Sequence, residues 1–336
     1  MKAKIGINGF GRIGRSVLRI GLGRDDLDFV AVNDIAPAGT LAHLFKYDSV
    51  FGVYPGEVKA REDGIEIDGK LIRIFSEKNP SDIGWEDCGT DIVVESTGIF
   101  RTKEQAALHT GKTVKKVVIT APAKGDVDLT TVLGVNGGGY DPAKHHIVSN
   151  ASCTTNCFSM LVKILHENFT VKRGEMTTVH SYTSDQRIHD APHSDLRRAR
   201  AAAESIIPTS TGAAEVIQVV FPELKGKLSA MAIRVPTPNV SLVDFSCEVE
   251  KEATPEAVNA AFKNASAGEL AGYVGFLESE LVSTDLVGRP ESAVFDPFLT
   301  SVTDGKLVKV VAWYDNEYGY SSRVADLVSL MAERAK

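Results

Sequence analysis

Short runs of hydrophobic, mostly β-branched residues alternate with amphipathic stretches along the first half of the chain. Each run is bounded by glycine, proline, asparagine or serine, a pattern typical of buried strands. In the first amphipathic stretch, Ile13, Val17 and Ile20 recur at helical spacing and mark one apolar face. Strands that alternate with crossover helices predict an α/β fold with a parallel sheet. We expect its strands at residues 4–8, 29–33, 91–96, 117–120 and 147–149.

Two short alternating segments interrupt this order, Ile65-Glu66-Ile67 and Leu71-Ile72-Arg73-Ile74. Asp63-Gly64 precedes the first segment, and Asp68-Gly69 separates the two. Asp-Gly pairs favour tight turns between antiparallel strands. The pattern therefore predicts a β-hairpin inserted into the nucleotide-binding type of fold.

The second half carries longer alternating segments, which predict a mostly antiparallel sheet with its own core. These segments are 177–180, 228–235, 241–249 and 307–314. The helices predicted among them are 153–168, 211–220 and 255–266. Thr254 and Pro255 are the expected N-cap and first residue of the last of these helices.

The change of pattern near residue 151 divides the chain into two domains. Its length agrees, because 336 residues at roughly 150 residues per domain give two domains. We expect a Rossmann-type domain over residues 1–151 and an α+β domain over residues 152–317. Hydrophobic residues at helical spacing predict a last helix, 318–336, that packs back against the first domain.

The composition is that of a globular protein, with 43% hydrophobic and 24% charged residues, which excludes disordered and fibrous classes. The longest apolar runs, such as Ile92-Val93-Val94, are far shorter than the ~20 residues of a membrane-spanning helix. The first residues carry no apolar signal region. We therefore expect a cytoplasmic protein with no membrane partner.

The charge balance and the cysteines narrow the possible partners. With 37 basic and 44 acidic residues the net charge is −7, which disfavours nucleic acid as a partner despite the cluster of Arg197, Arg198 and Arg200. Four cysteines are too few for a disulfide framework in a chain of this length and favour a reducing compartment. They are Cys88, Cys153, Cys157 and Cys247.

A glycine-rich loop follows the first predicted strand and opens the first predicted helix. Residues Gly9 to Gly14 fit the pattern G-x-G-x-x-G, in which glycines allow a tight turn and the close approach of a pyrophosphate. The helix N-terminus then binds the anion. Asp34 ends the second strand, 20 residues after Gly14, where a carboxylate binds the ribose hydroxyls of NAD and repels the 2′-phosphate of NADP. The competing interpretation is a glycine turn needed only for packing, with Asp34 a solvated charge.

Cys153 lies at the predicted start of helix 153–168, directly after a predicted strand. The N-terminal end of a helix lowers the pKa of a thiol and favours the nucleophilic thiolate. His180, at the end of a strand of the second domain, is the candidate base. The alternatives are a buried structural cysteine, a structural histidine, and a redox or zinc pair of Cys153 with Cys157, although no further zinc ligands are evident nearby.

One motif is Ser152-Cys153-Thr154-Thr155-Asn156-Cys157, and another is the run from Ile7 to Arg15. Together they resemble the phosphorylating, NAD-dependent glyceraldehyde-3-phosphate dehydrogenase family. The resemblance continues through segments 180–183, 195–203, 234–240 and 313–320. It implies a glycolytic and gluconeogenic enzyme that converts D-glyceraldehyde 3-phosphate, inorganic phosphate and NAD to 1,3-bisphosphoglycerate and NADH. It also implies a homotetramer, with the arginine cluster in a loop at its interface.

The same resemblance implies the roles of individual residues. Cys153 attacks the aldehyde to give a thiohemiacetal, His180 takes up the proton as hydride passes to NAD, and phosphate then attacks the thioester. The implied substrate and phosphate sites contain Ser152, Thr154, Thr183, Thr211, Gly212 and Arg234. The implied cofactor site contains Gly9, Gly11, Arg12, Ile13, Gly14, Asp34, Lys78, Thr97, Thr120 and Asn316, the last on the nicotinamide carboxamide. No metal is implied.

General chemistry supports two of the phosphate contacts independently. A guanidinium such as that of Arg234 binds phosphate through two hydrogen bonds. Thr211 and Gly212 begin a predicted helix, where backbone N–H groups bind anions. The competing interpretations are that Thr211 is only an N-cap and that Arg234 forms an ion pair on a strand face.

Two segments depart from the family pattern. Residues 190–193 read Asp-Ala-Pro-His, where strictly NAD-dependent relatives have leucine-proline and photosynthetic relatives that accept NADP have alanine-serine. Because Asp34 is retained, we expect a preference for NAD. Residues 51–55 replace the common histidine-glycine turn, a change for which the sequence offers no functional account.

Two other functions stay open at this point. One is erythrose-4-phosphate dehydrogenase, a relative that releases its acyl product to water, but segments 209–214 and 235–239 resemble the phosphorylating type. The other is a non-catalytic regulator that binds NAD or RNA. The presence of both Cys153 and His180 argues against it, because a binding protein needs neither.

Overall fold

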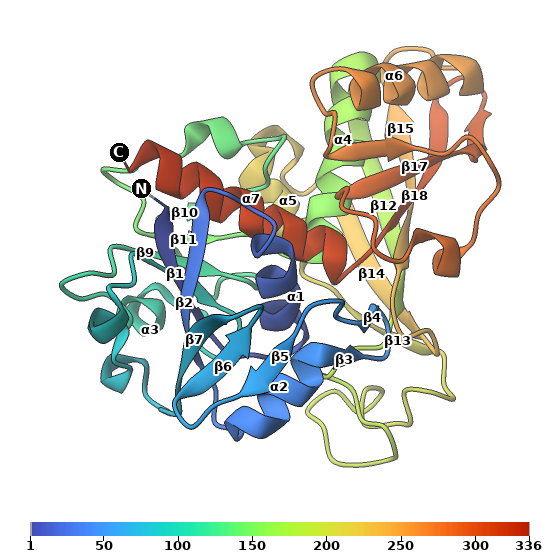
Figure 1. Cartoon of the computed structure of the whole chain (residues 1–336). Coiled ribbons are helices and arrows are strands. Elements are labelled where there is room, and N and C mark those ends of the chain that lie inside the picture. Colours follow the sequence, from blue (N-terminus) through green and yellow to red (C-terminus); the bar gives the residue numbers. More distant parts are fainter. Residues whose placement is uncertain (1, 336) are drawn as a thin grey trace. The chain divides into compact units, whose positions relative to one another are not determined.

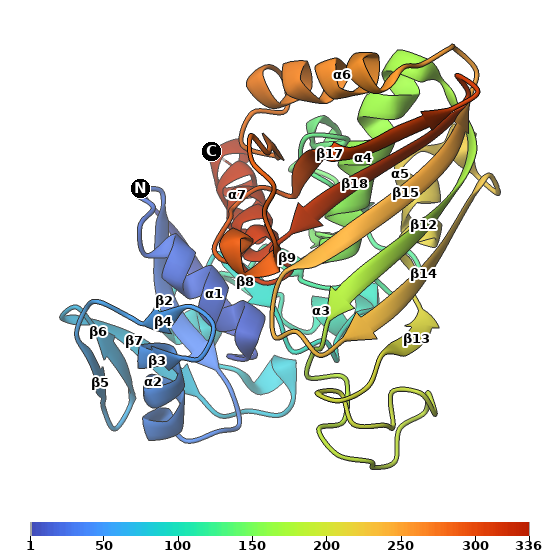
Figure 2. The same cartoon turned by 90° about the vertical axis from the view of Figure 1, so that its right-hand side faces the viewer.

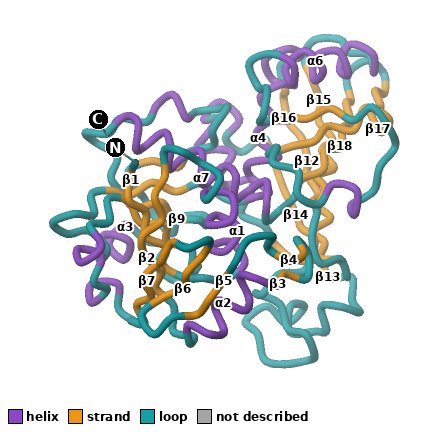
Figure 3. The backbone as a smooth tube through the Cα atoms, viewed as in Figure 1, coloured by secondary structure: helices purple, strands orange, loops and turns teal. Residues whose placement is uncertain are grey.

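The computed structural model describes residues 2–335, which form two units with separate sheets. The first unit contains Met1–Thr131, Gly138–Ala151 and Ser321–Lys336, and the second contains Val132–Gly137 and Ser152–Tyr320. Figure 3 shows one large sheet in each unit, with helices around it. The mixed α/β class predicted from the sequence is confirmed.

The first unit is built on a nine-stranded sheet in the order β10-β11-β9-β8-β1-β2-β7-β6-β5 (Figure 1). Its central strands are all parallel, as their short uninterrupted apolar runs predict. The parallel strands are β1 (Ala3–Asn8), β2 (Leu27–Asn33), β8 (Ile92–Glu95), β9 (Lys116–Ile119), β10 (Leu129–Thr130) and β11 (Ile147–Ser149). The five strands expected from the sequence are thus present, with ends that differ by one or two residues.

The predicted hairpin extends this sheet. β6 (Gly64–Ile67) and β7 (Lys70–Phe75) pair antiparallel, and β5 (Val58–Ala60) adds an outer strand. Asp68 and Gly69 join β6 to β7 with φ angles of 50° and 81°, the positive values that a tight hairpin turn demands. Since β7 also runs parallel to β2, the hairpin continues the main sheet rather than forming a separate one.

The helices of the first unit lie along this sheet. They are α1 (Arg12–Gly21), α2 (Ala38–Lys46), α3 (Lys103–Ala107) and most of α7 (Tyr318–Arg334), and a small hairpin of β3 (Tyr47–Asp48) and β4 (Gly52–Val53) follows α2. In α7, the residues at helical spacing, Val324, Leu327, Val328 and Met331, are buried. Arg24 forms an ion pair with Asp326, and Arg334 Nη1 donates a hydrogen bond to Tyr140 O at 2.6 Å. The part of α7 that belongs to this unit is therefore anchored near both of its ends.

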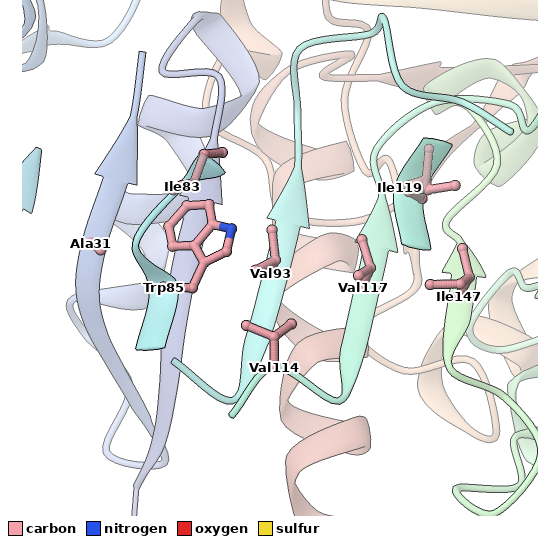
Figure 4. Close-up of a cluster of buried hydrophobic side chains, with 9 residues drawn as sticks. Ala31, Ile83, Trp85, Val93, Val114, Val117, Ile119 and Ile147 are labelled. Carbon is pink, nitrogen blue, oxygen red and sulfur yellow. The ribbon is translucent and has the colours of Figure 1, made fainter. Parts of the chain in front are cut away.

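Trp85 lies at the centre of one hydrophobic cluster of the first unit. Figure 4 shows it beside side chains from neighbouring strands, including Ala31 on β2 and Val93 on β8. The cluster continues to Val117 on β9 and Ile147 on β11. Buried apolar side chains therefore cover one face of the parallel strands. This packing fixes the positions of the strand ends.

The second unit contains a seven-stranded sheet in the order β13-β14-β12-β15-β18-β17-β16. Four of its six strand pairs are antiparallel, and β12 with β14 and β16 with β17 are parallel. The strands are β12 (Val171–Ser181), β13 (Ile207–Ser210), β14 (Leu228–Val235), β15 (Ser241–Val249), β16 (Val274–Phe276), β17 (Ala293–Thr303) and β18 (Leu307–Tyr314). The mostly antiparallel sheet predicted for this half is confirmed.

Helices pack on one face of this sheet. Figure 2 looks onto the opposite face, and α4 (Cys153–Phe169) and α5 (Ala213–Val220) lie behind the strands. The third helix, α6 (Pro255–Ala267), begins as predicted with Thr254 as N-cap, whose hydroxyl accepts a hydrogen bond from Ala257 N. Short 3₁₀ helices complete the two units at Pro80–Asp82, Trp85–Cys88, Gly137–Gly139, Pro222–Leu224 and Ser283–Leu286.

Several elements were not predicted, and the longest of them are β17 and α2. β17 contains Asp296-Pro297, and its pairing with β18 is irregular between Asp296 and Ser301. A proline has no N–H to donate to a neighbouring strand, so it hides the strand pattern. Helix α2 has Gly39 and Thr40 in its first turn, residues of low helix propensity.

Within residues 2–335, every helix is too short or too polar to cross a lipid bilayer.

Asp128 supports the start of β11 in the first unit. Its carboxylate accepts hydrogen bonds from His146 N and Ile147 N, both at 2.8 Å, and pairs with Lys103 Nζ at 2.7 Å. Burial alone would raise the pKa of Asp128, but Lys103 and the two N–H groups outweigh burial and lower it. The ionised form is therefore the one that stabilises the fold.

We expect Asp128→Asn to lower the free energy of unfolding by about 1–2 kcal/mol near neutral pH. Since the folded-state pKa is below the unfolded value of about 3.9, the contribution is present above that pH and is lost as the pH falls through the folded-state value. Denaturant unfolding at neutral and acidic pH measures the change, with the exposed Asp126→Asn as control. A destabilisation that stays constant down to about pH 3 would contradict this account.

Candidate active site

The carboxyl ends of the parallel strands of the first unit carry the glycine loop. Gly9 has a φ of +88°, and a Cβ there would lie 2.7 Å from Thr97 N. A Cβ on Gly14 would lie 2.2 Å from Gly9 O, so both glycines are required by the fold itself. Gly11 differs, because a Cβ on it would meet nothing within 4 Å. Gly11 therefore leaves open space beside the N-terminus of α1, where no side chain caps the helix.

The loop is tied to Asp34 at the end of the neighbouring strand. Asp34 Oδ2 accepts a hydrogen bond from Phe10 N at 2.8 Å, and Oδ1 accepts one from Ala36 N at 3.0 Å. The adjoining Ile35 is 68% exposed, and so is Ile99, which follows Thr97. Two large apolar side chains left in water beside the loop suit the faces of an aromatic ring such as adenine. The sequence analysis missed both isoleucines. The signal that could have revealed Ile35 is its place directly after Asp34, the residue that ends the predicted strand.

Thr97 and Thr120 are both held by Glu95, a buried residue that the sequence analysis also missed. Glu95, 2% exposed, accepts from Thr97 N at 2.8 Å and from Asn8 Nδ2 at 2.6 Å, and contacts His109 Nε2 at 2.9 Å. Its backbone carbonyl accepts from Thr120 N at 2.9 Å. Gly9, Asp34, Thr97 and Thr120 thus lie at the same edge of the sheet, whereas Lys78 is exposed in the loop after β7.

Arg12, the first residue of α1, is held by the hairpin whose sequence departs from the family pattern. Its Nη1 pairs with Asp48 Oδ2 at 2.5 Å, and its guanidinium lies 5.5 Å from the centre of the Phe51 ring. Asp48 Oδ1 accepts from Phe51 N at 3.0 Å, which fixes the hairpin turn. Phe51 therefore helps to position the residue that begins the helix, and Ile13 follows it in the first turn.

In the second unit Cys153 is the first residue of α4, as predicted. Ser152 is the N-cap, and its hydroxyl accepts from Thr155 N at 3.0 Å. Cys153 Sγ lies 3.6 Å from His180 Nε2, within hydrogen-bonding distance for sulfur. The strand β12 supplies His180 at its penultimate position, so the helix start and the strand end meet.

The other ring nitrogen of His180 is close to two groups. Nδ1 lies 2.7 Å from Ser181 O and 2.7 Å from Arg234 Nη1, and Arg234 Nη1 also donates to Ser181 O at 3.0 Å. In the tautomer with hydrogen on Nδ1, this nitrogen donates to Ser181 O, since a carbonyl only accepts, and it accepts no hydrogen bond from Arg234. A neutral ring with hydrogen on Nδ1 presents the lone pair of Nε2 to the thiol, which is the arrangement a base requires.

Burial sets the protonation states of this pair. Burial, followed by the charge of Arg234, lowers the pKa of His180 to about 3, so the imidazole is neutral near pH 7. Burial also raises the pKa of the Cys153 thiol, although Arg234 and the N–H of Thr154 act in the opposite direction. The helix start thus acts on the thiol pKa in the predicted direction, but burial outweighs it and the net shift is upward. The thiol and the base are both neutral, and the proton can move as the sulfur reacts.

Arg234 is a partly buried cation without an acidic partner among the described residues. Among residues 2–335 no carboxylate forms an ion pair with it, and its Nε is buried without a hydrogen-bond partner. The strand-face ion pair considered above is therefore absent from the part of the chain described. A guanidinium in this state is suited to an anion such as phosphate, which accepts two hydrogen bonds in its plane.

The remaining candidate residues of this unit lie in different surroundings. The Thr154 hydroxyl is bonded to Tyr314 OH at 2.9 Å, which in turn bonds the Thr178 hydroxyl at 2.9 Å, so its side chain is engaged inside the fold. Thr183 follows β12, and its N–H donates to Gln186 Oε1 at 3.2 Å. Gly212, not Thr211, is the N-cap of α5, while the Thr211 hydroxyl accepts from Ala213 N at 3.3 Å.

Asn316 follows β18 in the second unit. It is 6% exposed, and its Oδ1 accepts hydrogen bonds from the hydroxyls of Ser181 and Ser241, both at 2.9 Å. The sequence analysis named Asn316 but neither serine. The amide nitrogen of Asn316 is therefore available to donate hydrogen bonds, and it lies beside the residues that adjoin His180.

The competing interpretations of the cysteines find little support. Cys153 and Cys157 are both free thiols, and Cys157 is fully buried. Among residues 2–335 no group of three or more His, Cys, Asp or Glu side chains is arranged to hold a metal ion.

The arginine cluster is also accounted for within the fold. Arg198 pairs with Asp185, and its Nε donates to the Thr209 hydroxyl at 3.0 Å. Arg200 Nε pairs with Asp190 Oδ2 at 2.8 Å. Carboxylates thus neutralise two of the three guanidiniums of the cluster, and Arg197 Nη1 donates to Pro208 O at 3.4 Å.

Comparison with known proteins agrees with this geometry. Residues 3–103 match the family model of the glyceraldehyde 3-phosphate dehydrogenase NAD binding domain, and residues 152–316 match that of the C-terminal domain. The chain is 57% identical over 334 residues to a glyceraldehyde-3-phosphate dehydrogenase of Geobacillus stearothermophilus, covering 99% of both chains. It is 56% identical over 331 residues to glyceraldehyde-3-phosphate dehydrogenase 1 of Bacillus cereus, covering 98% of this chain and 99% of that protein.

The contact between the thiol and the imidazole predicts selective reactivity. We expect iodoacetamide to label Cys153 faster than Cys88 or Cys247, because only Cys153 has a neutral imidazole 3.6 Å from its sulfur. His180→Asn should slow the labelling of Cys153 by about tenfold or more. Mass spectrometry of quenched samples measures the rates, and His166→Asn on the same helix is the matched control. Equal labelling of the three cysteines would contradict the assignment of His180 as base.

Proposed function

Since the chain belongs to the glyceraldehyde-3-phosphate dehydrogenase family of NAD-dependent oxidoreductases, we propose that Cys153 and His180 perform its reaction, the phosphorylating oxidation of D-glyceraldehyde 3-phosphate. The observation that carries the assignment of these residues is the 3.6 Å contact between Cys153 Sγ and His180 Nε2 beside the unpaired Arg234. The family is glycolytic, and the domain matched by residues 3–103 binds NAD.

The two residues have complementary roles. The sulfur of Cys153 bonds to the aldehyde carbon while its proton passes to Nε2 of His180 and from there to the aldehyde oxygen, which gives a thiohemiacetal. His180, neutral again, then takes the hydroxyl proton of that adduct as the hydride leaves the carbon. NAD, when bound, supplies the hydride acceptor that converts the adduct to a thioester. Inorganic phosphate attacks the thioester carbon, the C–S bond breaks, and the released product is 1,3-bisphosphoglycerate with the thiol restored.

The phosphate groups require positive charge, although the chain as a whole has a net charge of −7. We assign the phosphate of the substrate to Arg234 and Thr183, because Arg234 has no carboxylate partner among the described residues. We assign inorganic phosphate to Ser152, Thr154, Thr211 and Gly212. The uncapped N-terminus of α5 at Gly212 supports this second assignment.

The residues of the first unit fit the dinucleotide. The open space at Gly11 and the uncapped start of α1, with Arg12, Ile13 and Gly14, suit the pyrophosphate. Asp34 retains unshared electron pairs for the ribose hydroxyls while it holds Phe10 N. Lys78, Thr97 and Thr120 complete the proposed groove, and Asn316 is assigned to the nicotinamide carboxamide. The Asp34 carboxylate favours NAD over NADP.

We further propose a cytoplasmic homotetramer. Four cysteines without disulfides suit a reducing compartment. The sheet face of the second unit opposite to its helices carries the exposed Met231 and Leu307, and the loop after β12 carries Ile188, Leu196 and Ile206, which are 78%, 81% and 70% exposed. Apolar side chains exposed to this extent support burial against other copies of the chain. Sedimentation equilibrium at micromolar concentration tests the tetramer.

Two rival functions make different predictions. Erythrose-4-phosphate dehydrogenase chemistry ends in attack by water and needs no inorganic phosphate. A non-catalytic NAD- or RNA-binding protein needs neither thiol nor base, and the contact between Cys153 and His180 disfavours it. The paired state of Arg198 and Arg200 disfavours RNA in particular.

One assay separates the three functions. We expect NADH to form from glyceraldehyde 3-phosphate and NAD in the presence of inorganic phosphate, and the steady rate to fall at least about a hundredfold without phosphate. Cys153→Ser should abolish turnover, because a serine hydroxyl beside a neutral imidazole is a far weaker nucleophile. Cys88→Ser is the matched control. Undiminished turnover without phosphate would exclude the phosphorylating mechanism.

Arg234 provides a second test. We expect Arg234→Leu to raise KM for glyceraldehyde 3-phosphate by about tenfold or more, because the variant loses a contact of two hydrogen bonds with the phosphate dianion. KM for NAD should change much less. Steady-state kinetics measure both constants, and Arg61→Leu in an exposed strand turn is the control. An unchanged KM for the aldehyde would remove Arg234 from the phosphate site.

A further inference from the structure

Ser181, the last residue of β12, contacts four residues through three of its atoms. Its carbonyl accepts from His180 Nδ1 and Arg234 Nη1 at 2.7 and 3.0 Å. Its N–H donates to Ser241 Oγ at 3.1 Å, and its hydroxyl donates to Asn316 Oδ1 at 2.9 Å. The residue is fully buried. A single strand end thus touches the base, the phosphate-binding cation and the amide assigned to the cofactor.

The hydrogen bonds determine which way the Asn316 amide faces. Because Ser241 Oγ already accepts from Ser181 N, its hydroxyl hydrogen is available to donate, and Asn316 Oδ1 lies 2.9 Å away. The Ser181 hydroxyl donates to the same oxygen. Two converging donors require the oxygen of the amide at this place. The nitrogen Nδ2 must then face the other way, and no hydrogen bond joins it to another described residue.

The backbone of Asn316 is fixed as well. The preceding Asp315, 1% exposed, accepts hydrogen bonds at Oδ1 from Glu317 N at 2.9 Å and Tyr318 N at 2.8 Å. Its Oδ2 accepts from Asn239 Nδ2 at 2.9 Å and Gly288 N at 2.8 Å. Four hydrogen bonds to the Asp315 carboxylate therefore hold the turn that carries Asn316.

We propose that Ser181 and Ser241 are positioning residues that hold the Asn316 amide with its NH₂ group toward the ligand, so that it binds the nicotinamide carboxamide through the carboxamide oxygen. The proposal rests on the proposed function, because it takes Asn316 as the contact to nicotinamide. It adds a specificity device, since an amide held in one orientation donates only and rejects a ring substituent that lacks an acceptor at that place. Ser181 also links this contact to the base through its own carbonyl.

The test compares NAD with ADP-ribose, which lacks the nicotinamide ring. For Ser181→Ala we expect the Kd of NAD, measured by isothermal titration calorimetry, to rise about fivefold, the effect of one ordinary hydrogen bond. The Kd of ADP-ribose should stay within about twofold, because no part of that ligand reaches Asn316. A variant that is merely damaged weakens both ligands equally, and that result would overturn the proposal. Ser246→Ala, on the same strand as Ser241, is the matched control.

A double-mutant cycle tests whether Ser181 acts through Asn316. In the Asn316→Ala background, Ser181→Ala should cause no further loss of NAD affinity. Additive losses would contradict the proposal. Ser241→Ala provides an independent variant if Ser181→Ala folds poorly, as ADP-ribose binding would reveal.

A failure of the proposed function would look different. The iodoacetamide reactivity of Cys153 should be unchanged in Ser181→Ala within about twofold, because the carbonyl that bonds His180 Nδ1 is retained. If the wild-type protein binds NAD but forms no NADH from glyceraldehyde 3-phosphate, the proposed function is wrong. If it forms NADH and Ser181→Ala leaves the Kd of NAD unchanged, only the positioning role is wrong.

Discussion

A positive charge held away from water governs the chemistry of the second unit. Removing a guanidinium from water costs free energy that hydrogen bonds and opposite charges must recover. For this purpose Arg234 has the neutral Ser181 carbonyl, and no carboxylate among the described residues pairs with it. The site is therefore short of one negative charge, and either a bound phosphate or a thiolate on Cys153 restores the balance. Burial, followed by the charge of Arg234, keeps the imidazole unprotonated, so a base and an anion site can lie side by side.

The parts of the fold with simple periodicity were predictable from the sequence. The parallel strands of the first unit are short, fully buried and bounded by turn residues, so their composition alone identifies them. The Asp68-Gly69 turn has one stable geometry, and the hairpin followed from it. Cys153 was placed correctly at a helix start, because Ser152 is a good N-cap after a short strand.

Other features depend on contacts between distant residues and left little trace in the sequence. Glu95 looks like an ordinary strand-end charge, yet Asn8, Thr97 and His109 surround it. The neutral state of Cys153 and His180 follows from how deeply they are buried, which no local pattern reveals. Pro297 concealed a long strand, since the irregular pairing that tolerates it exists only opposite β18. Ser181 and Ser241 matter through the direction of their hydroxyl hydrogens, a property of the assembled network.

Two neighbouring strands of the second unit, β12 and β14, run parallel, and their register sets His180 directly opposite Arg234. Parallel neighbours cannot be joined by a short turn, so the chain between them, residues 182–227, is long. The ladder of hydrogen bonds, and not this connection, determines which residues stand opposite each other. Insertions and deletions in the connection therefore leave the pairing of base and cation intact, whereas a single residue added inside β12 before His180 would turn the imidazole to the other face of the sheet. Outside Thr183, Thr211 and Gly212, the long connection can therefore acquire new surface contacts while the base and the cation stay opposite each other.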